Sequence, residues 1–395
     1  MNTKSQYRGT FISLFIATAA AMLGIGIIEP IMPLYAKNMG ASGIMLGLIF
    51  SGFAVSRMLF APWIGRISDK QGRKKFLVCG IFLLIIFSVL YVVAQTPLAL
   101  ICIRTAQGLA SVMITPIAQA YVGDITPVGK EGRYMNLFFV SYIGGTAIGP
   151  VVGGVLSDKI SLEAPFYAMA AMAFVALLLV FWLVPRTTTE NKRSSGKQPS
   201  LFKGFKNVIR DRNMKGILIY LWSRGFYRWG FNSFFPILAT RFAHLSKTQV
   251  GLALSAYMLA GAILQYPSGV YADKYVKYRG EFILIGGLLS AICMFVIPSL
   301  NNVYGMIAFT LIMGLTSAFS RASTIAIRTE RGRVHGMGTV AGASTTSISL
   351  GQVVGPILFG VIVSYFNIPI AFYFGGIIGI FGTIMAFWYI RKLKV

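Results

Sequence analysis

Residues 44–75 read IMLGLIFSGFAVSRMLFAPWI followed by GRISDKQGRKK, an apolar run and then a segment with five basic side chains. A helix of about 20 apolar residues crosses the hydrocarbon core of a bilayer. Lys and Arg gather on the cytoplasmic side of membrane proteins, so the basic segment marks where such a helix emerges inside the cell. The stretch therefore predicts an integral membrane protein.

The rest of the chain repeats this pattern, with apolar runs separated by short polar turns. Of 395 residues, 56% are apolar and 12% are charged, and the mean hydropathy is +0.71. Soluble proteins contain about 25% charged residues, so the composition excludes a soluble enzyme and predicts an all-α polytopic membrane protein. Twelve transmembrane helices are expected, at 11–35, 44–64, 76–94, 98–121, 134–156, 165–184, 216–239, 248–271, 281–299, 303–327, 337–365 and 369–390.

The charge is strongly basic, with 36 Lys and Arg against 11 Asp and Glu. In a soluble domain this excess would indicate a nucleic-acid partner. With a cytoplasmic N-terminus, however, 27 of the 36 basic residues fall in cytoplasmic segments and only four in outer loops. This distribution predicts that both termini are cytoplasmic. It also explains the charge without nucleic acid, and we expect the protein in the cell membrane.

An internal repeat divides the chain. Gly65 and Asp69 recur as Gly269 and Asp273, and Gly149-Pro150 recurs as Gly355-Pro356, at offsets of 204 and 206. We expect an N-terminal six-helix bundle at 1–184, a cytoplasmic linker at 185–215 and a C-terminal six-helix bundle at 216–395. Parallel repeats of this kind build transporters in which two bundles rock around a central substrate site.

The sequence offers no sign of an enzyme. The three cysteines lie in separate spans, the two histidines lie in loops on opposite sides, and no Walker-type phosphate loop occurs. We therefore expect no metal and no cofactor. The expected partners are a small-molecule substrate, protons and the lipid bilayer, and we expect the protein to be a monomer.

Four motifs carry a family resemblance that covers essentially the whole chain. They are Leu23-Gly24-x-Gly26-x-x-Glu29-Pro30-x-x-Pro33, Gly65-x-x-x-Asp69-x-x-Gly72-Arg73-Lys74-Lys75, Arg104-x-x-Gln107-Gly108 and Gly145-x-x-x-Gly149-Pro150-x-x-Gly153-Gly154. With them the sequence resembles the major facilitator superfamily, and within it the twelve-span drug:proton antiporter branch. A secondary active transporter that exports a small molecule is the function that this resemblance implies.

The second motif implies a cytoplasmic gate formed by Gly65, Asp69, Gly72 and Arg73. Glycine at position 72 would permit a tight turn, and Arg73 could reach Asp124 at the end of the fourth span. The corresponding segment in the second half keeps Asp273 but has Val276 at the position equivalent to Gly72, so we expect it to form a weaker gate. An ordinary basic loop with an aspartate cap is the alternative.

The glycine motif in the fifth span marks antiporters, as against symporters, in the superfamily. It comprises Gly145, Gly149, Pro150, Gly153 and Gly154. Small residues four apart let helices approach closely, so simple helix packing is the alternative interpretation. The resemblance favours export, and uptake by proton symport stays open.

Proton coupling requires a group that can gain and lose a proton inside the membrane. Glu29 is the only acidic residue clearly within a span, and a carboxylate removed from water binds a proton more readily. Arg104 matches the arginine that the family implicates in coupling. Asp69 and Asp124 are the rival proton carriers nearer the cytoplasm, and permanent pairing of Glu29 with an arginine is the alternative.

Five arginines lie inside the expected spans, which is unusual because a charge there is costly. Arg224 and Arg228 are four residues apart and so share a helix face, and Arg321 near the inner end of its span could simply snorkel. We predict a substrate site formed by Arg57, Arg224, Arg228, Tyr227, Gln107 and Asn232. Guanidinium groups suit carboxylate or phosphate, so an anionic cargo such as a carboxylate-bearing metabolite or siderophore is one hypothesis. A broad multidrug exporter and a non-transporting sensor or channel are the others.

Overall fold

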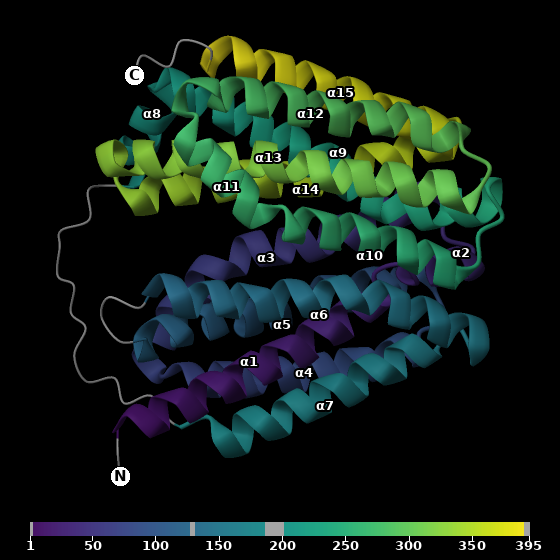
Figure 1. Cartoon of the computed structure of the whole chain (residues 1–395). Helices are drawn as coiled ribbons and strands as arrows, with labels where there is room; N and C mark the ends of the chain where they lie inside the picture. The colour runs from purple at the N-terminus through teal and green to yellow at the C-terminus, as the bar shows by residue number, and fades with distance from the viewer. Residues whose placement is uncertain (1–2, 127–130, 186–200, 391–395) are drawn as a thin grey trace. The chain divides into compact units, whose positions relative to one another are not determined.

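The computed structural model describes residues 3–126, 131–185 and 201–390, and every regular element in them is a helix (Figure 1). The predicted linker lies largely in 186–200, outside the described residues. The helices are α1 (Thr3–Ile28), α2 (Met32–Asn38), α3 (Gly43–Gln71), α4 (Arg73–Val93), α5 (Pro97–Ile125), α6 (Glu131–Lys159), α7 (Ala164–Leu183), α8 (Leu201–Arg210), α9 (Arg212–Phe242), α10 (Lys247–Ile263), α11 (Gln265–Lys274), η1 (Val276–Tyr278), α12 (Arg279–Val296), η2 (Ile297–Ser299), α13 (Val303–His335), α14 (Met337–Tyr365) and α15 (Ile368–Ile390).

Within the described residues, eleven helical segments are long and apolar enough to cross a membrane. Each corresponds to one of the twelve expected spans. The remaining expected span is α9, a helix of 31 residues whose apolar sequence is interrupted by Arg224 and Arg228. The prediction of an all-α protein with twelve transmembrane helices is therefore confirmed.

The helices form two compact units. Unit 1 consists of Met1–Ala41, Gly52–Arg193 and Ser246–Ser255, and unit 2 of Ser42–Ser51, Ser194–Leu245 and Ala256–Val395. The first residues of α10 belong to unit 1, where the Asp158 carboxylate at the end of α6 accepts hydrogen bonds from the backbone amides of Lys247 (3.2 Å) and Thr248 (2.8 Å). Asp158 thus satisfies donors that the start of a helix leaves unpaired.

In unit 1, α6 lies against α1 along its glycines. A Cβ atom at Gly145 would be 2.5 Å from the carbonyl oxygen of Ala19, and one at Gly149 would be 2.5 Å from the carbonyl carbon of Gly26. At Gly153 the corresponding distance to the Ile27 oxygen is 1.9 Å. These glycines are therefore required for backbone-to-backbone contact between the two helices.

Unit 2 repeats this interface between α14 and α9. A Cβ atom at Gly351 would be 2.2 Å from the Trp222 oxygen, and one at Gly355 would be 2.2 Å from the Phe226 oxygen. Gly351 and Gly355 follow Gly145 and Gly149 by 206 residues. The repeat seen in the sequence is thus also a repeat of helix contacts.

Asp211 caps the beginning of α9. Its carboxylate accepts a hydrogen bond from the Met214 amide at 3.0 Å, lies 3.0 Å from Nε2 of His335 and forms an ion pair with Arg331 at 3.6 Å. Burial acts to raise the pKa of Asp211, but the hydrogen bonds from His335 and Met214 and the Arg331 charge outweigh it, and the pKa lies below its ordinary value. The cap therefore joins the start of α9 to the end of α13.

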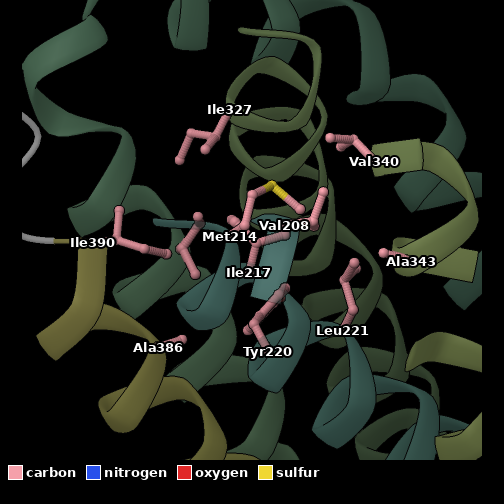
Figure 2. Packing of buried hydrophobic residues seen from close by; sticks show 11 residues of the cluster. Val208, Met214, Ile217, Tyr220, Leu221, Ile327, Val340, Ala343, Ala386 and Ile390 are labelled. Carbon is pink, nitrogen blue, oxygen red and sulfur yellow. The ribbon is translucent and has the colours of Figure 1, made fainter. Parts of the chain in front are cut away.

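The core of unit 2 lies just beyond this cap. Figure 2 shows Ile217, Tyr220 and Leu221 of α9 among Ile327 of α13, residues 340 and 343 of α14, and residues 386 and 390 of α15. Tyr220 is 1% exposed and Ile217 is fully buried. Packing on several sides fixes the rotation of α9, and with it the direction of the face that carries Arg224.

Candidate functional site

Glu29 lies at a break in the first membrane span. The helix α1 ends at Ile28 and α2 begins at Met32, so Glu29, Pro30 and Ile31 form the connection. The Glu29 amide bonds to the Gly26 oxygen at 3.2 Å, which is a tightened turn rather than an α-helical bond. Proline at position 30 cannot donate a backbone hydrogen bond. Discontinuous helices of this kind carry substrate and ion sites in secondary transporters.

Arg104 of α5 lies in a buried polar network in unit 1. Its Nη1 donates to Oε1 of Gln107 at 2.7 Å, and the Tyr91 hydroxyl donates to the same oxygen at 2.8 Å. The Tyr35 hydroxyl in turn donates to the Tyr91 carbonyl at 3.0 Å. Arg104 is 4% exposed and Gln107 is 1% exposed. The network fixes the guanidinium group inside the helix bundle.

The ring of Phe53 on α3 lies close to two arginines that the sequence singled out. The guanidinium carbon of Arg104 is 4.7 Å from the ring centroid, and that of Arg57 is 5.6 Å from it. Aromatic faces attract cations at these distances. Unit 1 thus brings together Arg57 of α3 with Arg104 and Gln107 of α5, although Arg57 lies outside the motif that contains the other two.

The predicted gate segment forms an ion-pair triad at the junction of α3 and α4. Arg73 pairs with Asp69 at 2.8 Å and with Asp124 at the end of α5. Gly72 has φ +92°, a backbone conformation that L-residues other than glycine rarely adopt. The contact expected between Arg73 and Asp124 is therefore present, while the gating role of the segment stays a prediction.

Unit 2 contains a counterpart of this triad that the sequence interpretation missed. Arg279 at the start of α12 pairs with Asp273 at 3.4 Å and with Glu330 of α13 at 3.2 Å. Arg279 and Glu330 follow Arg73 and Asp124 by 206 residues, which is the signal that could have identified them. Val276 begins the short helix η1 where the first half has a glycine turn.

Arg224 and Arg228 lie on one face of α9 among tyrosines. Tyr220 precedes Arg224 by four residues and Tyr227 follows it by three, so both lie near its face of the helix. The guanidinium carbon of Arg228 is 5.5 Å from the centroid of the Tyr257 ring. The Nη2 atom of Arg224 and the Nε atom of Arg228 are buried without a hydrogen-bond partner among the described residues. Such donors are costly unless a ligand or water accepts from them.

Arg321 of α13, which could snorkel according to its place in the sequence, forms a side-chain hydrogen bond with α11. Its Nη1 donates to Oε1 of Gln265 at 3.2 Å. Gln265 also lines a cavity of about 680 Å³ in unit 2, together with Gly269, Ala322 and Ile325. Depth along a span did not reveal this contact between α13 and α11.

The predicted substrate residues fall into two groups. Arg57 and Gln107 lie in unit 1, whereas Arg224, Tyr227, Arg228 and Asn232 lie on α9 in unit 2. Tyr227 is 3% exposed and Asn232 is 4% exposed. The sequence interpretation missed Tyr220, Tyr257 and Gln265, because neutral residues in a span carry no distinguishing signal.

Comparisons with known proteins agree with these features. The family model described as Major Facilitator Superfamily matches residues 14–244 and 217–394. Over 381 residues the chain is 28% identical to an uncharacterised MFS-type transporter of Methanocaldococcus jannaschii, covering 96% of this chain and 97% of that protein. Two further relatives have names that refer to resistance. They are multidrug resistance protein 1 of Bacillus subtilis (26% identity, 92% and 90% coverage) and the quinolone resistance protein NorA of Staphylococcus aureus (25% identity, 86% of both chains).

Solved transporter structures share the fold. A bacterial homologue of the human lysosomal transporter Spinster superposes with a TM-score of 0.84 at 14% identity, over 99% of this chain and 98% of that one. The nucleoside transporter NupG superposes with a TM-score of 0.79 at 13% identity and full coverage of both chains. At these identities the similarity concerns the fold alone.

Proposed function

The chain belongs to the Major Facilitator Superfamily, and from that premise we propose that this transporter exports a small anionic molecule in exchange for protons. The proposal places it in a cell membrane, with both termini in the cytoplasm and alternating access between its two bundles, 1–184 and 216–395. The observation that carries it is the pair Arg224 and Arg228, in which the Nη2 atom of the first and the Nε atom of the second are buried and lack a hydrogen-bond partner in the described part of the chain.

Export is supported by two independent features. Two relatives that align with most of the chain have names that refer to multidrug and quinolone resistance. The glycines of α6 that resemble the antiporter motif make backbone contacts with α1, so the motif has the close packing for which its residue types are suited.

An anionic cargo is supported by the charge of the buried groups. Arg57 and Arg104 lie near the Phe53 ring in unit 1, and Arg228, one turn from Arg224, lies near the Tyr257 ring in unit 2. Positive groups held at low dielectric repel a cationic drug and attract carboxylate or phosphate. Tyr227, Gln107 and Asn232 are the neutral residues that we assign to the same substrate site.

Proton exchange is proposed for Glu29, with Arg104 as its coupling partner in the transport cycle. A carboxyl group at a helix break is well placed to change its surroundings when the helices move, because fewer backbone hydrogen bonds hold it. Asp69 and Asp124 remain the rival proton carriers, and Asp69, Arg73 and Asp273 are assigned to the cytoplasmic gate.

A broad multidrug exporter is the second candidate, and the names of the relatives favour it. Under this alternative the arginines would be structural, and lipophilic cations would be transported. Proton-coupled uptake on the same fold is a further alternative, which differs in the direction of transport relative to the pH gradient.

Proteoliposomes test these functions directly. We expect an imposed pH gradient to drive radiolabelled succinate or citrate against the proton flow, and to leave the cation tetraphenylphosphonium unmoved. The variant Glu29→Gln should abolish gradient-driven transport but retain substrate binding. The matched control is Glu163→Gln, which removes a carboxyl group next to the start of α7 and should transport normally.

The opposite results have clear meanings. Transport of tetraphenylphosphonium and of no anion would contradict the anionic cargo and support the multidrug alternative. Accumulation of substrate in the direction of the proton flow would establish uptake. Full gradient-driven transport by the Glu29→Gln variant would transfer the coupling role to Asp69 or Asp124.

A further inference from the structure

Two basic side chains at the start of α9 lie against the last turn of α15. The Nη2 atom of Arg212 donates a hydrogen bond to the Trp388 carbonyl at 3.2 Å, and its guanidinium carbon is 5.6 Å from the centroid of the Trp388 ring. The Nζ atom of Lys215 is 5.7 Å from the centroid of the Tyr389 ring. Arg212 and Lys215 are three residues apart and so share a face of α9. We call these four residues the basic–aromatic cluster.

Close packing of α9 against α15 holds this cluster in place. A Cβ atom at Gly216 would be 2.8 Å from the backbone oxygen of Ala386, so the two helices are in close contact directly after the cluster. Met214 and Ile390 are fully buried in the core of unit 2 (Figure 2). The two basic side chains of the cluster are exposed. The core therefore fixes one side of the helix pair and leaves these charges on its outer side.

The described acidic residues do not neutralise the two charges. Asp211, which is adjacent to the cluster in the sequence, pairs instead with Arg331 and His335. Within residues 3–126, 131–185 and 201–390, neither Arg212 nor Lys215 forms an ion pair. Both side chains are cationic at neutral pH, so the cluster presents two positive charges that an anionic partner could compensate.

An apolar stripe on α15 leads away from the cluster. Ile377, Phe381, Ile384 and Trp388 are each between 50% and 65% exposed. Their spacings of four, three and four residues place them on one face of the helix. The cluster therefore lies at the end of an exposed apolar surface, which is the arrangement that an amphiphile with a charged head and apolar chains requires.

Unit 1 ends with a similar combination. The Nζ atom of Lys74, in the first turn of α4, donates to the Phe181 carbonyl in the last turn of α7 at 2.7 Å and lies 5.8 Å from the centroid of the Phe181 ring. The next residue, Trp182, is 75% exposed and precedes Trp388 by 206 residues. Tryptophan gathers at the level of the lipid headgroups in membrane proteins. The recurrence supports an interfacial role for the last turn of α15.

We propose that the basic–aromatic cluster binds an anionic phospholipid, with the phosphodiester at Arg212 and Lys215 and an acyl chain along the apolar stripe of α15. Phosphate oxygens accept charge-assisted hydrogen bonds from guanidinium and ammonium groups. A zwitterionic lipid fits less well, because its own ammonium group repels the same two side chains. The site goes beyond the proposed transport activity, and only its assignment to the cytoplasmic leaflet rests on the proposed orientation.

Native mass spectrometry of the purified full-length protein in detergent measures the binding of single lipids. The probes are dioleoylphosphatidylglycerol, which is anionic, and dioleoylphosphatidylcholine, which has the same acyl chains and is zwitterionic. We expect the first phosphatidylglycerol to bind about tenfold or more tightly than phosphatidylcholine, because two basic side chains contribute to its affinity. Equal affinities for the two lipids would overturn the inference.

Variants at the start of α9 separate this site from the general charge of the protein. Arg212→Gln and Lys215→Gln should each weaken phosphatidylglycerol binding about fivefold and leave phosphatidylcholine binding unchanged. Arg212→Lys keeps the charge and should restore most of the affinity. The matched control is Arg241→Gln, which removes an exposed arginine from the last turn of the same helix and should bind phosphatidylglycerol like the wild type.

Equal losses of phosphatidylglycerol affinity in Arg212→Gln and Arg241→Gln would mean that only net charge matters, and would overturn the site. Displacement of bound lipid by glycerol 3-phosphate would do the same, because it would assign the cluster to a soluble phosphate. If Arg212→Gln fails to fold, Lys215→Gln decides the question.

These measurements involve neither a cargo nor a proton gradient. Transport without a preference for the anionic lipid would therefore contradict only this site. A preference for the anionic lipid in a protein that exports nothing would contradict only the proposed function.

Discussion

The contact between α6 and α1 makes Gly149→Ala the sharpest structural test. A Cβ atom at Gly149 would lie 2.5, 2.6 and 2.6 Å from three backbone atoms of Gly26 and Ile27. An ordinary van der Waals contact begins at 3.4 Å, so each approach is too short by 0.8 to 0.9 Å. Backbone atoms cannot rotate away as the end of a side chain can, and the two helices must therefore separate.

Two opposing effects determine how much Gly149→Ala lowers the free energy of unfolding. Overpacking a tightly packed interface lowers it by about 1–3 kcal/mol, and the short backbone contacts place Gly149→Ala near the upper end of this range. Alanine stabilises a helix interior by about 1 kcal/mol relative to glycine. The net loss should therefore be about 2 kcal/mol. Gly144→Ala is the matched control, because a Cβ atom there meets nothing within 4 Å and should gain up to about 1 kcal/mol.

The assay is unfolding of the purified protein in detergent followed by tryptophan fluorescence, with transport measured in parallel. Gly149→Ala should unfold at a lower temperature than the wild type and transport more slowly, whereas Gly144→Ala should match or exceed the wild type in stability. Similar stabilities of the two variants would refute the conclusion that Gly149 is needed for close helix contact.

Three further predictions concern the gate segment and the start of α9. Gly72→Ala should lower the free energy of unfolding by about 1–2 kcal/mol, because Gly72 has a φ of +92°. A Cβ atom at Gly65 would meet nothing within 4 Å, so Gly65→Ala should be neutral or stabilising in the same unfolding assay. A double-mutant cycle on Arg73→Ala and Asp124→Asn should give a coupling of roughly 0.5–1 kcal/mol, since Asp124 is 39% exposed; a coupling of zero would mean that the pair has no energetic role. Asp211 has a pKa below the ordinary 3.8, so the stability it contributes is present above pH 3.8 and is lost as the pH falls through the folded value. Unfolding of Asp211→Asn should accordingly be less acid-sensitive than that of the wild type, and identical pH profiles would be the contrary result.

The positions of the membrane-spanning helices were largely predictable from local sequence. An apolar run long enough to cross a bilayer forms a helix there because the backbone must satisfy its own hydrogen bonds. The spans near 44–64 and 76–94 correspond to α3 and α4 for this reason. The turn at Gly72 was also predictable, because glycine is the residue that tolerates its backbone conformation.

Ion pairs between residues that are far apart in the sequence were harder to predict. The pairing of Arg73 with Asp124 followed from a motif and a span end, whereas Arg279 with Glu330 required the repeat offset to be applied to residues outside the motif. Glu29 was placed correctly in the first span, but the break between α1 and α2 at that residue was not specified. Helix breaks depend on neighbouring helices as well as on local prolines.

The amino-acid sequence by itself determined that the chain crosses a membrane, that it repeats, and that it carries arginines where charge is expensive. Hydrophobicity and charge act residue by residue, so these properties can be read along the chain. Only the tertiary structure decided that Arg321 of α13 donates a hydrogen bond to Gln265 of α11. That outcome depends on the rotation of α13 about its own axis, which is set by the packing of residues such as Ile327 against helices distant in the sequence.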